Sequence, residues 1–94
     1  MPHYIATVTV STELRGGEAE AIDNAKVSVE LSGPEDGVIE VRFAGQLDAP
    51  QDPTHVCVTL PNGLSFYGAI LGGEANSQGG WLRFEGQWFD LDGL

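Results

Sequence analysis

Short runs of alternating apolar and polar residues make up most of the chain, and glycine- and proline-containing segments separate them. With 13 glycines and 5 prolines in 94 residues, few stretches suit a long helix. The runs are rich in valine and aromatic residues, which favours strands. We therefore predict an all-β fold, either a small antiparallel barrel or a strongly bent sandwich.

We expect about six strands in a single domain spanning residues 1–94. Their predicted ranges are Tyr4–Thr12, Lys26–Ser32, Val38–Leu47, His55–Leu60, Leu64–Leu71 and Trp81–Phe89. The segment Gly16–Asn24 has room for one or two helical turns, with residues 17–24 the expected place, but it is too short for a stable helix.

Glycine-containing turns predict how neighbouring strands pair. Around Gly33–Gly37, in-register pairing places Leu31 opposite Ile39 on an apolar face, and Glu30 opposite Glu40 on the other face. Around Pro61–Gly63 two registers are possible, and a three-residue loop is preferred because it sets apolar residues opposite each other. Gly72–Gly80 is expected to be a loop.

In the preferred register at Pro61–Gly63, Val58 lies opposite Phe66. Across Gly72–Gly80, pairing places Gly68 opposite Phe84, an arrangement that suits a curved sheet. The predicted core follows from these faces: Val8, Val10, Val27, Val29, Leu31, Ile39, Val41, Phe43, Val56, Val58, Leu60, Phe66, Ile70, Leu82, Phe84 and Trp88.

A weak internal similarity is also present. Val27–Leu31 (VSVEL) resembles Val56–Leu60 (VCVTL), and Arg42–Gln46 (RFAGQ) resembles Arg83–Gln87 (RFEGQ). The spacing between the two blocks differs in the two halves, so these segments are not a fixed-period repeat. The similarity supports only the expectation that both halves contain hairpins.

The charge of the chain restricts its partners. Four basic residues against 14 acidic ones give a net charge of −10, which disfavours direct binding to nucleic acid or to anionic lipid. The acidic surface either attracts a basic protein by long-range steering or simply keeps the domain soluble. No apolar run is long enough for a membrane span, and no secretory signal is recognisable.

Residues for catalysis and metal binding are scarce. Cys57, the single cysteine, lies two residues after His55, but no donor-rich turn adjoins them, so we predict no enzyme activity. Asp48, Asp52 and His55 have side chains suited to a metal ion but no diagnostic spacing. We therefore predict no metal site and no cofactor.

The face directed away from the core carries four residues that are typical of protein interfaces: Tyr67, Leu71, Trp81 and Arg83. The alternative is that the first strand or Gly16–Asn24 covers this face as a second core layer.

The expected pair Glu30–Glu40 brings like charges together, which destabilises a strand pair. Either Arg42 relieves this repulsion, or the pair awaits a cation from a partner.

From these features we predict a non-enzymatic, acidic, cytoplasmic protein-binding domain. Its expected partner is a protein with a basic surface, and one version of the hypothesis is an inhibitor or adaptor of a nucleic-acid-handling protein. Its expected binding residues are Glu30, Glu40, Tyr67, Leu71, Trp81 and Arg83. The alternative is a small-ligand-binding β-barrel receptor for a nucleotide, a sugar or an ion.

The excess negative charge predicts a salt effect. Because like charges repel in the compact state and salt screens them, moderate salt should raise the melting temperature of the domain. Thermal unfolding followed by circular dichroism at increasing sodium chloride tests this expectation. A fall in the melting temperature would show that the carboxylates are instead held in favourable pairs.

Overall fold

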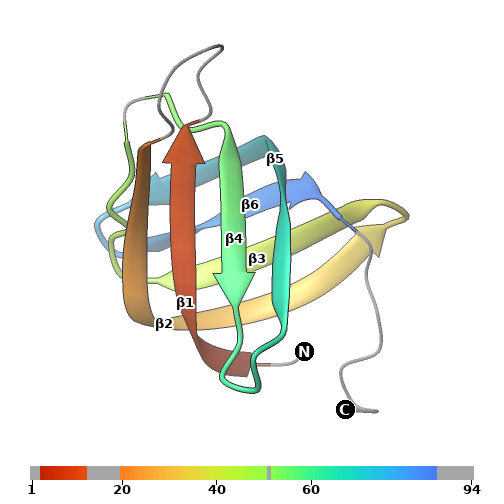
Figure 1. The fold of residues 1–94 in the computed structure, drawn as a ribbon, viewed down its shortest axis with the longest axis horizontal. Helices are drawn as coiled ribbons and strands as arrows, with labels where there is room; N and C mark the ends of the chain where they lie inside the picture. The colour runs from red at the N-terminus through yellow and green to blue at the C-terminus, as the bar shows by residue number, and fades with distance from the viewer. Residues whose placement is uncertain (1–2, 13–19, 51, 87–94) are drawn as a thin grey trace.

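The described part of the computed structural model, residues 3–12, 20–50 and 52–86, is a closed antiparallel barrel of six strands (Figure 1). The strands are β1 (His3–Thr12), β2 (Glu20–Glu35), β3 (Val38–Ala44), β4 (His55–Thr59), β5 (Ser65–Asn76) and β6 (Gly79–Glu85). The all-β prediction is confirmed, and of the two predicted architectures the chain adopts the barrel.

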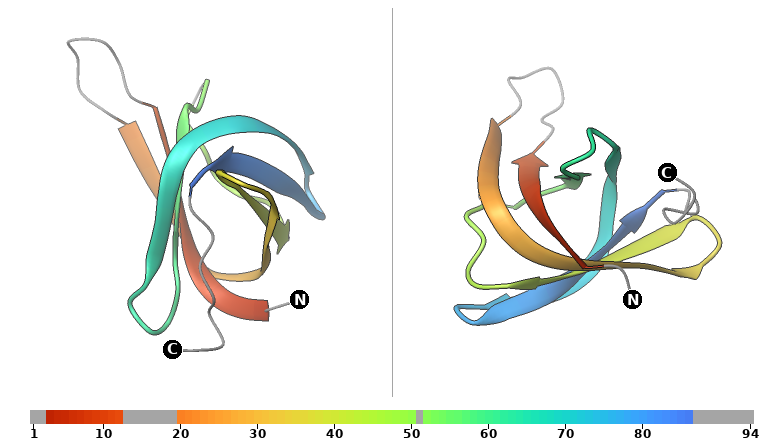
Figure 2. Two further views of the ribbon diagram at one scale, coloured as in Figure 1. Left: turned by 90° about the vertical axis from the view of Figure 1, so that its right-hand side faces the viewer. Right: turned by 90° about the horizontal axis from the view of Figure 1, so that it is seen from below.

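Two consecutive meanders build the barrel. Around the wall the strand order is β1-β2-β3-β6-β5-β4, so β1, β2 and β3 form one meander and β4, β5 and β6 form the other. The pairs β1–β4 and β3–β6 join the two meanders edge to edge. Figure 2 shows how strongly the strands curve around the axis, with β5 arching over the end of the barrel.

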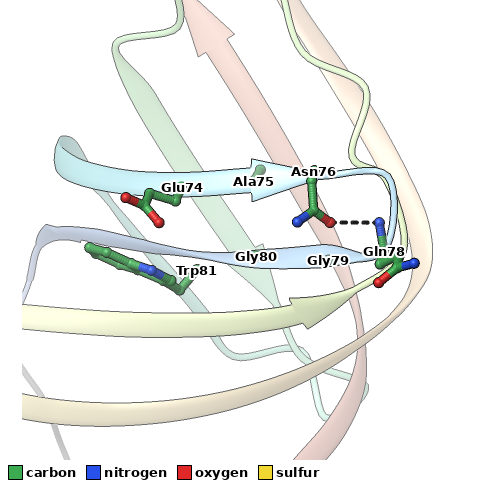
Figure 3. A pocket seen from close by; sticks show the side chains of 7 residues that line it. All are labelled: Glu74, Ala75, Asn76, Gln78, Gly79, Gly80 and Trp81. Atoms are coloured by element: carbon green, nitrogen blue, oxygen red, sulfur yellow. Dashed lines mark hydrogen bonds between the residues drawn. The ribbon is translucent and has the colours of Figure 1, made fainter.

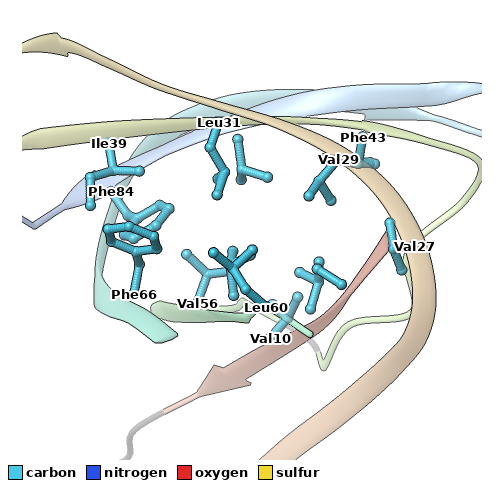
Figure 4. Packing of buried hydrophobic residues seen from close by; sticks show 14 residues of the cluster. Val10, Val27, Val29, Leu31, Ile39, Phe43, Val56, Leu60, Phe66 and Phe84 are labelled. Carbon is cyan, nitrogen blue, oxygen red and sulfur yellow. The ribbon is translucent and has the colours of Figure 1, made fainter. Parts of the chain in front are cut away.

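A cluster of buried apolar residues forms the core of the barrel (Figure 4). Thirteen of the fourteen buried apolar residues are among those predicted from the sequence, and Ala6 is the addition. The predicted residues Ile70 and Leu82 pack against this cluster while partly buried, and Trp88 lies outside the described residues. As in other small barrels, side chains occupy the centre.

The predicted register of the β2–β3 hairpin is wrong by two residues. Leu31 pairs with Val41 instead of Ile39. The hairpin turns tightly at Asp36–Gly37, where the glycine has a φ of 77°, and the register shifts near Pro34, which has no amide hydrogen to give to a ladder. Because the register shifts by an even number of residues, the side chains predicted to point into the core, such as Leu31 and Ile39, still do so.

The hairpin at Pro61–Gly63 has the predicted three-residue loop. Val58 pairs with Phe66, and the Leu60 amide donates to the Leu64 carbonyl at 2.7 Å. The loop glycine has a φ of 91°, a left-handed conformation that glycine adopts without strain.

The segment Gly72–Gly80 was expected to be a loop, and this prediction is wrong. Most of it is strand, and the turn is confined to Ser77 and Gln78. Phe84 consequently pairs with Ile70 rather than with the predicted Gly68. The misleading signal is the glycines, because Gly73, Gly79 and Gly80 let neighbouring backbones approach each other and do not break the strand.

The expected helical turns within Gly16–Asn24 are also wrong where the structure can be described. Glu20–Asn24 is the start of β2 and pairs with Val8–Thr12 of β1; residues 13–19 lie outside the described chain. A short helical nucleus is costly, whereas pairing with β1 supplies a ladder of backbone hydrogen bonds.

Strand β5 changes partners between Ala69 and Ile70, and Gly68 lies just before this change. Residues Ser65–Ala69 pair with β4, and Ile70–Asn76 pair with β6. A β-carbon placed on Gly68 would overlap the Glu85 carbonyl group, whereas one on Gly72 would meet open space. The close approach at Gly68 therefore leaves no room for a side chain.

This difference predicts opposite outcomes for two glycine-to-alanine substitutions. Gly68→Ala should lower the free energy of unfolding by about 2–3 kcal/mol because the backbone at Glu85 must move. Gly72→Ala should change it by less than about 1 kcal/mol, since its β-carbon meets no atom. Urea unfolding of both variants measures the difference, and equal losses would contradict the close approach at Gly68.

Candidate functional site

An exterior face spreads over β2, β3, β6 and β5 in two rows of neighbouring residues. The first row is Glu30, Arg42, Trp81 and Glu74, and the second is Ser32, Glu40, Arg83 and Gly72. These positions alternate along each strand with the inward-facing core residues, so their side chains point away from the core. We call these eight residues the Trp81 face.

Glu40 is the centre of this face. Arg42 donates from Nε to its Oε2 at 3.0 Å, and Arg83 donates from Nε to its Oε1 at 2.9 Å. The Glu40 side chain is only 8% exposed, while those of Arg42 and Arg83 are 60% and 46% exposed. Two arginines from different strands thus cover one carboxylate and still present much of their own surface to solvent.

The two arginines also determine how Glu40 titrates. Burial alone would raise the pKa of this carboxyl group, but the hydrogen bonds and positive charges of Arg83 and Arg42 outweigh burial and lower its pKa below the ordinary value of 4.5. Glu40 therefore remains ionised and holds both guanidinium groups in place across the β3–β6 pair.

The predicted direct pair of Glu30 and Glu40 is wrong. With the register shifted, Glu30 lies opposite Arg42, and Glu40 lies opposite Ser32. Of the two alternatives for relieving the repulsion, Arg42 does bind Glu40, but Arg83 binds it as well. The contribution of Arg83 was not predicted because it depends on the pairing of β3 with β6, which are remote in sequence.

Trp81 lies beside Arg83 and borders an open recess. The Arg83 guanidinium carbon is 5.5 Å from the centre of the Trp81 ring, which is the geometry of a cation–π contact. Figure 3 shows the side chains of Trp81 and Glu74 on the same side of the β5–β6 hairpin, with Asn76 and Gln78 near its tip. Together with intervening small residues they line a recess of about 640 Å³.

The structure separates the four predicted interface residues into two groups. Trp81 and Arg83 lie together, but Tyr67 pairs across from Cys57 on the β4–β5 wall and stacks on His55, with ring centres 5.5 Å apart and planes at 12°. Leu71 lies at the irregularity of β5.

The path along β5 from Tyr67 to Glu74, the neighbour of Trp81, is seven residue steps, or roughly 20 Å. Tyr67 and Leu71 are each 53% exposed, so in the described chain neither β1 nor the start of β2 covers them as a second core layer. The predicted face therefore exists only in part, and its aromatic residues occupy two different walls.

The residues considered for a metal site lie apart in the described part of the chain. No three histidine, cysteine or acidic side chains in this part are placed to hold a metal ion, so Asp48, Asp52 and His55 do not converge. His55 Nδ1 instead lies 2.8 Å from the Thr54 hydroxyl. Asn24 exchanges hydrogen bonds with the backbone of Asp48 at 2.8 and 2.9 Å, which anchors the β3–β4 connection.

Comparisons with known protein families, with curated proteins and with solved structures found no match. In the described residues, no helix has the length and apolar character needed to cross a membrane.

The Glu40 network predicts a pH-dependent contribution to stability. Because the folded-state pKa of Glu40 is lowered, its contribution is complete above 4.5 and is lost as the pH falls below that value. Glu40→Gln should lower the free energy of unfolding at pH 7 by about 1 kcal/mol, a modest value since the arginines are partly exposed. It should also flatten the decline below pH 4.5.

Urea unfolding of the wild type and of Glu40→Gln across the acidic range tests this. Glu30→Gln is the matched control at pH 7, because this exposed carboxylate should contribute less than about 0.5 kcal/mol there. Superimposable pH profiles for the wild type and Glu40→Gln would contradict a stabilising role for the network.

Proposed function

We propose that this domain is a non-enzymatic protein-binding module that acts through the Trp81 face. The observation that carries the proposal is the combination of a half-buried tryptophan with two partly exposed arginines fixed on one carboxylate. Tryptophan and arginine, together with tyrosine, are enriched in interface hot spots. Fixing them before binding reduces the conformational entropy that a complex would otherwise lose.

The charge of the chain supports a basic partner. At a net charge of −10, the domain attracts positively charged proteins over several ångströms and accelerates their encounter. Two of its four basic residues, Arg42 and Arg83, are held on Glu40, so they offset the acidic surface only locally. A nucleic-acid-handling protein that this domain inhibits or recruits is one partner with the required charge.

The barrel interior supports this choice over a receptor that encloses its ligand. The fourteen buried apolar residues fill the centre, and the recess beside Trp81 is open on the exterior. This recess favours one version of the alternative function, a site for a sugar-like ring, because Glu74, Asn76 and Gln78 supply polar groups next to an aromatic ring. A thermal-shift screen of sugars, nucleotides and ions tests that alternative.

Capture experiments with two aromatic variants test the protein-binding proposal. Immobilised Trp81→Ala should retain at least about tenfold less of any specific partner than the wild type, since truncating a hot spot of this kind costs 2 kcal/mol or more. Tyr67→Ala is the matched control: it removes an exposed aromatic residue from the β4–β5 wall and should capture normally.

Circular dichroism should show both variants folded, because neither ring belongs to the core cluster. Quantitative mass spectrometry of the captured proteins at low and high salt provides the measurement. Equal capture by the wild type and by folded Trp81→Ala would overturn the proposal, and selective loss in Tyr67→Ala would move the site to the other wall.

A further inference from the structure

Strand β5 has an edge that no described strand pairs with. Its pairing with β4 ends at Ala69, yet the strand continues to Asn76 with β6 on one side only. The Ile70 amide still donates to the Thr54 carbonyl at 2.8 Å. Beyond Ile70, no strand within residues 3–12, 20–50 and 52–86 pairs with the opposite side.

The pairing pattern shows which backbone groups lie on this edge. The Gly45 amide donates to the Gln78 carbonyl at 2.9 Å, so the backbone groups of Gln78 point toward β3. In an antiparallel pair this direction repeats at every second residue, so Gly80 and Leu82 also direct their backbone groups toward β3. Trp81, which lies between them, directs its backbone groups to the other side, toward β5. It therefore exchanges backbone hydrogen bonds with Glu74, the residue opposite. Since the direction alternates, Gly73 and Ala75 direct their N–H and C=O groups away from β6.

The edge is accessible. Gly73, Glu74, Ala75 and Asn76 are all exposed. An exposed edge of this kind is a template for pairing with an extended segment. Glu74 and the irregularity between Ile70 and Gly72 are the features that natural sheets use to prevent indiscriminate pairing.

An apolar cavity lies directly inside this edge. Its volume is about 150 Å³, and its lining comprises Val10, Phe43, Leu47, Ala49, Pro53, Ile70, Ala75 and Leu82. Ala49, Pro53 and Ala75 are exposed, so the cavity opens to solvent beside β5. A cavity of this size accommodates one benzene-sized apolar group.

We propose that the partner bound by the Trp81 face contributes an extended segment that pairs with the edge Gly73–Ala75. This inference rests on the proposed protein-binding function and specifies the form of the partner. In the partner's segment, the two residues that lie opposite Gly73 and Ala75 are apolar, and one of their side chains enters the cavity. The residue between them is lysine or arginine, because it lies on the exterior opposite Glu74.

Three observations converge on this occupant. The outward-directed donors and acceptors of Gly73 and Ala75 are complementary to another backbone, the cavity suits an apolar side chain on the inner face, and Glu74 suits a cation on the outer face. Glu74 also lies next to Trp81, so the edge and the Trp81 face are continuous. An alternating apolar and basic strand satisfies all three requirements with the two-residue period of a β-strand.

A capped heptapeptide of alternating lysine and valine is a suitable probe. In nuclear magnetic resonance titrations of the ¹⁵N-labelled domain, it should shift the amide signals of Gly73 and Ala75 and slow their hydrogen exchange. A comparator methylated on the valine backbone nitrogens has the same charge but lacks the pairing donors, so it should bind at least about tenfold more weakly.

The variant Ala75→Pro removes an edge donor while leaving the β6 ladder intact, because proline is tolerated where the amide points away from the sheet. It should bind the peptide at least about tenfold more weakly, whereas Ala75→Ser, which keeps the donor, should bind normally. Circular dichroism and the amide exchange of β6 check that both variants are folded.

Equal binding of the methylated and unmethylated peptides, or no binding of either, would overturn the proposal. Protected Gly73 and Ala75 amides in the free domain would also overturn it, as would a dimer that Ala75→Pro dissociates, because a second copy would then occupy the edge. If cellular capture depends on Trp81 but not on the Ala75 donor, the protein-binding function stands and the strand pairing is wrong.

Discussion

The pairing of β3 with β6 is the contact on which the rest of this structure depends. It joins the two meanders on one side of the barrel, as β1–β4 does on the other, and so encloses a core that neither three-stranded sheet could bury alone. The same pairing places Arg83 of one meander against Glu40 of the other. Closure of the barrel and assembly of the Trp81 face are therefore one structural event.

Much of this fold could be predicted from local sequence, because alternation assigns each residue to a face whatever the register. Of the predicted core residues that the structure describes, Ile70 and Leu82 are the two that are partly buried rather than buried. The turn at Pro61–Gly63 was also predictable, since its short loop leaves few registers. The registers around Gly33–Gly37 and Gly72–Gly80 were not, because the strands there continue through glycines and a proline that usually mark loops.

The candidate site was harder to predict because non-local pairing creates it. Local pairing of the last hairpin indicated one aromatic patch, but the correct register moves Glu74 opposite Trp81 and leaves Tyr67 with β4. The change of partner after Ala69 and the irregularity between Ile70 and Gly72 redirect β5 from one wall to the next. Sequence periodicity alone does not show whether a glycine in a strand ends it, bends it or lets another backbone approach.

The two meanders have equivalent strand orders, and this equivalence explains the position of the Trp81 face. Val41 pairs with Leu82, so the similar segments that begin at Arg42 and Arg83 occupy matching positions on either side of this pair. The resemblance between Val27–Leu31 and Val56–Leu60 has no such basis, since β2 matches β5 rather than β4. The two meanders differ two residues before each arginine: Glu40 precedes Arg42, whereas Trp81 precedes Arg83. Both arginines bind the single carboxylate, and Arg83 also lies over the tryptophan, so the specialised surface forms where the symmetry of the barrel is broken.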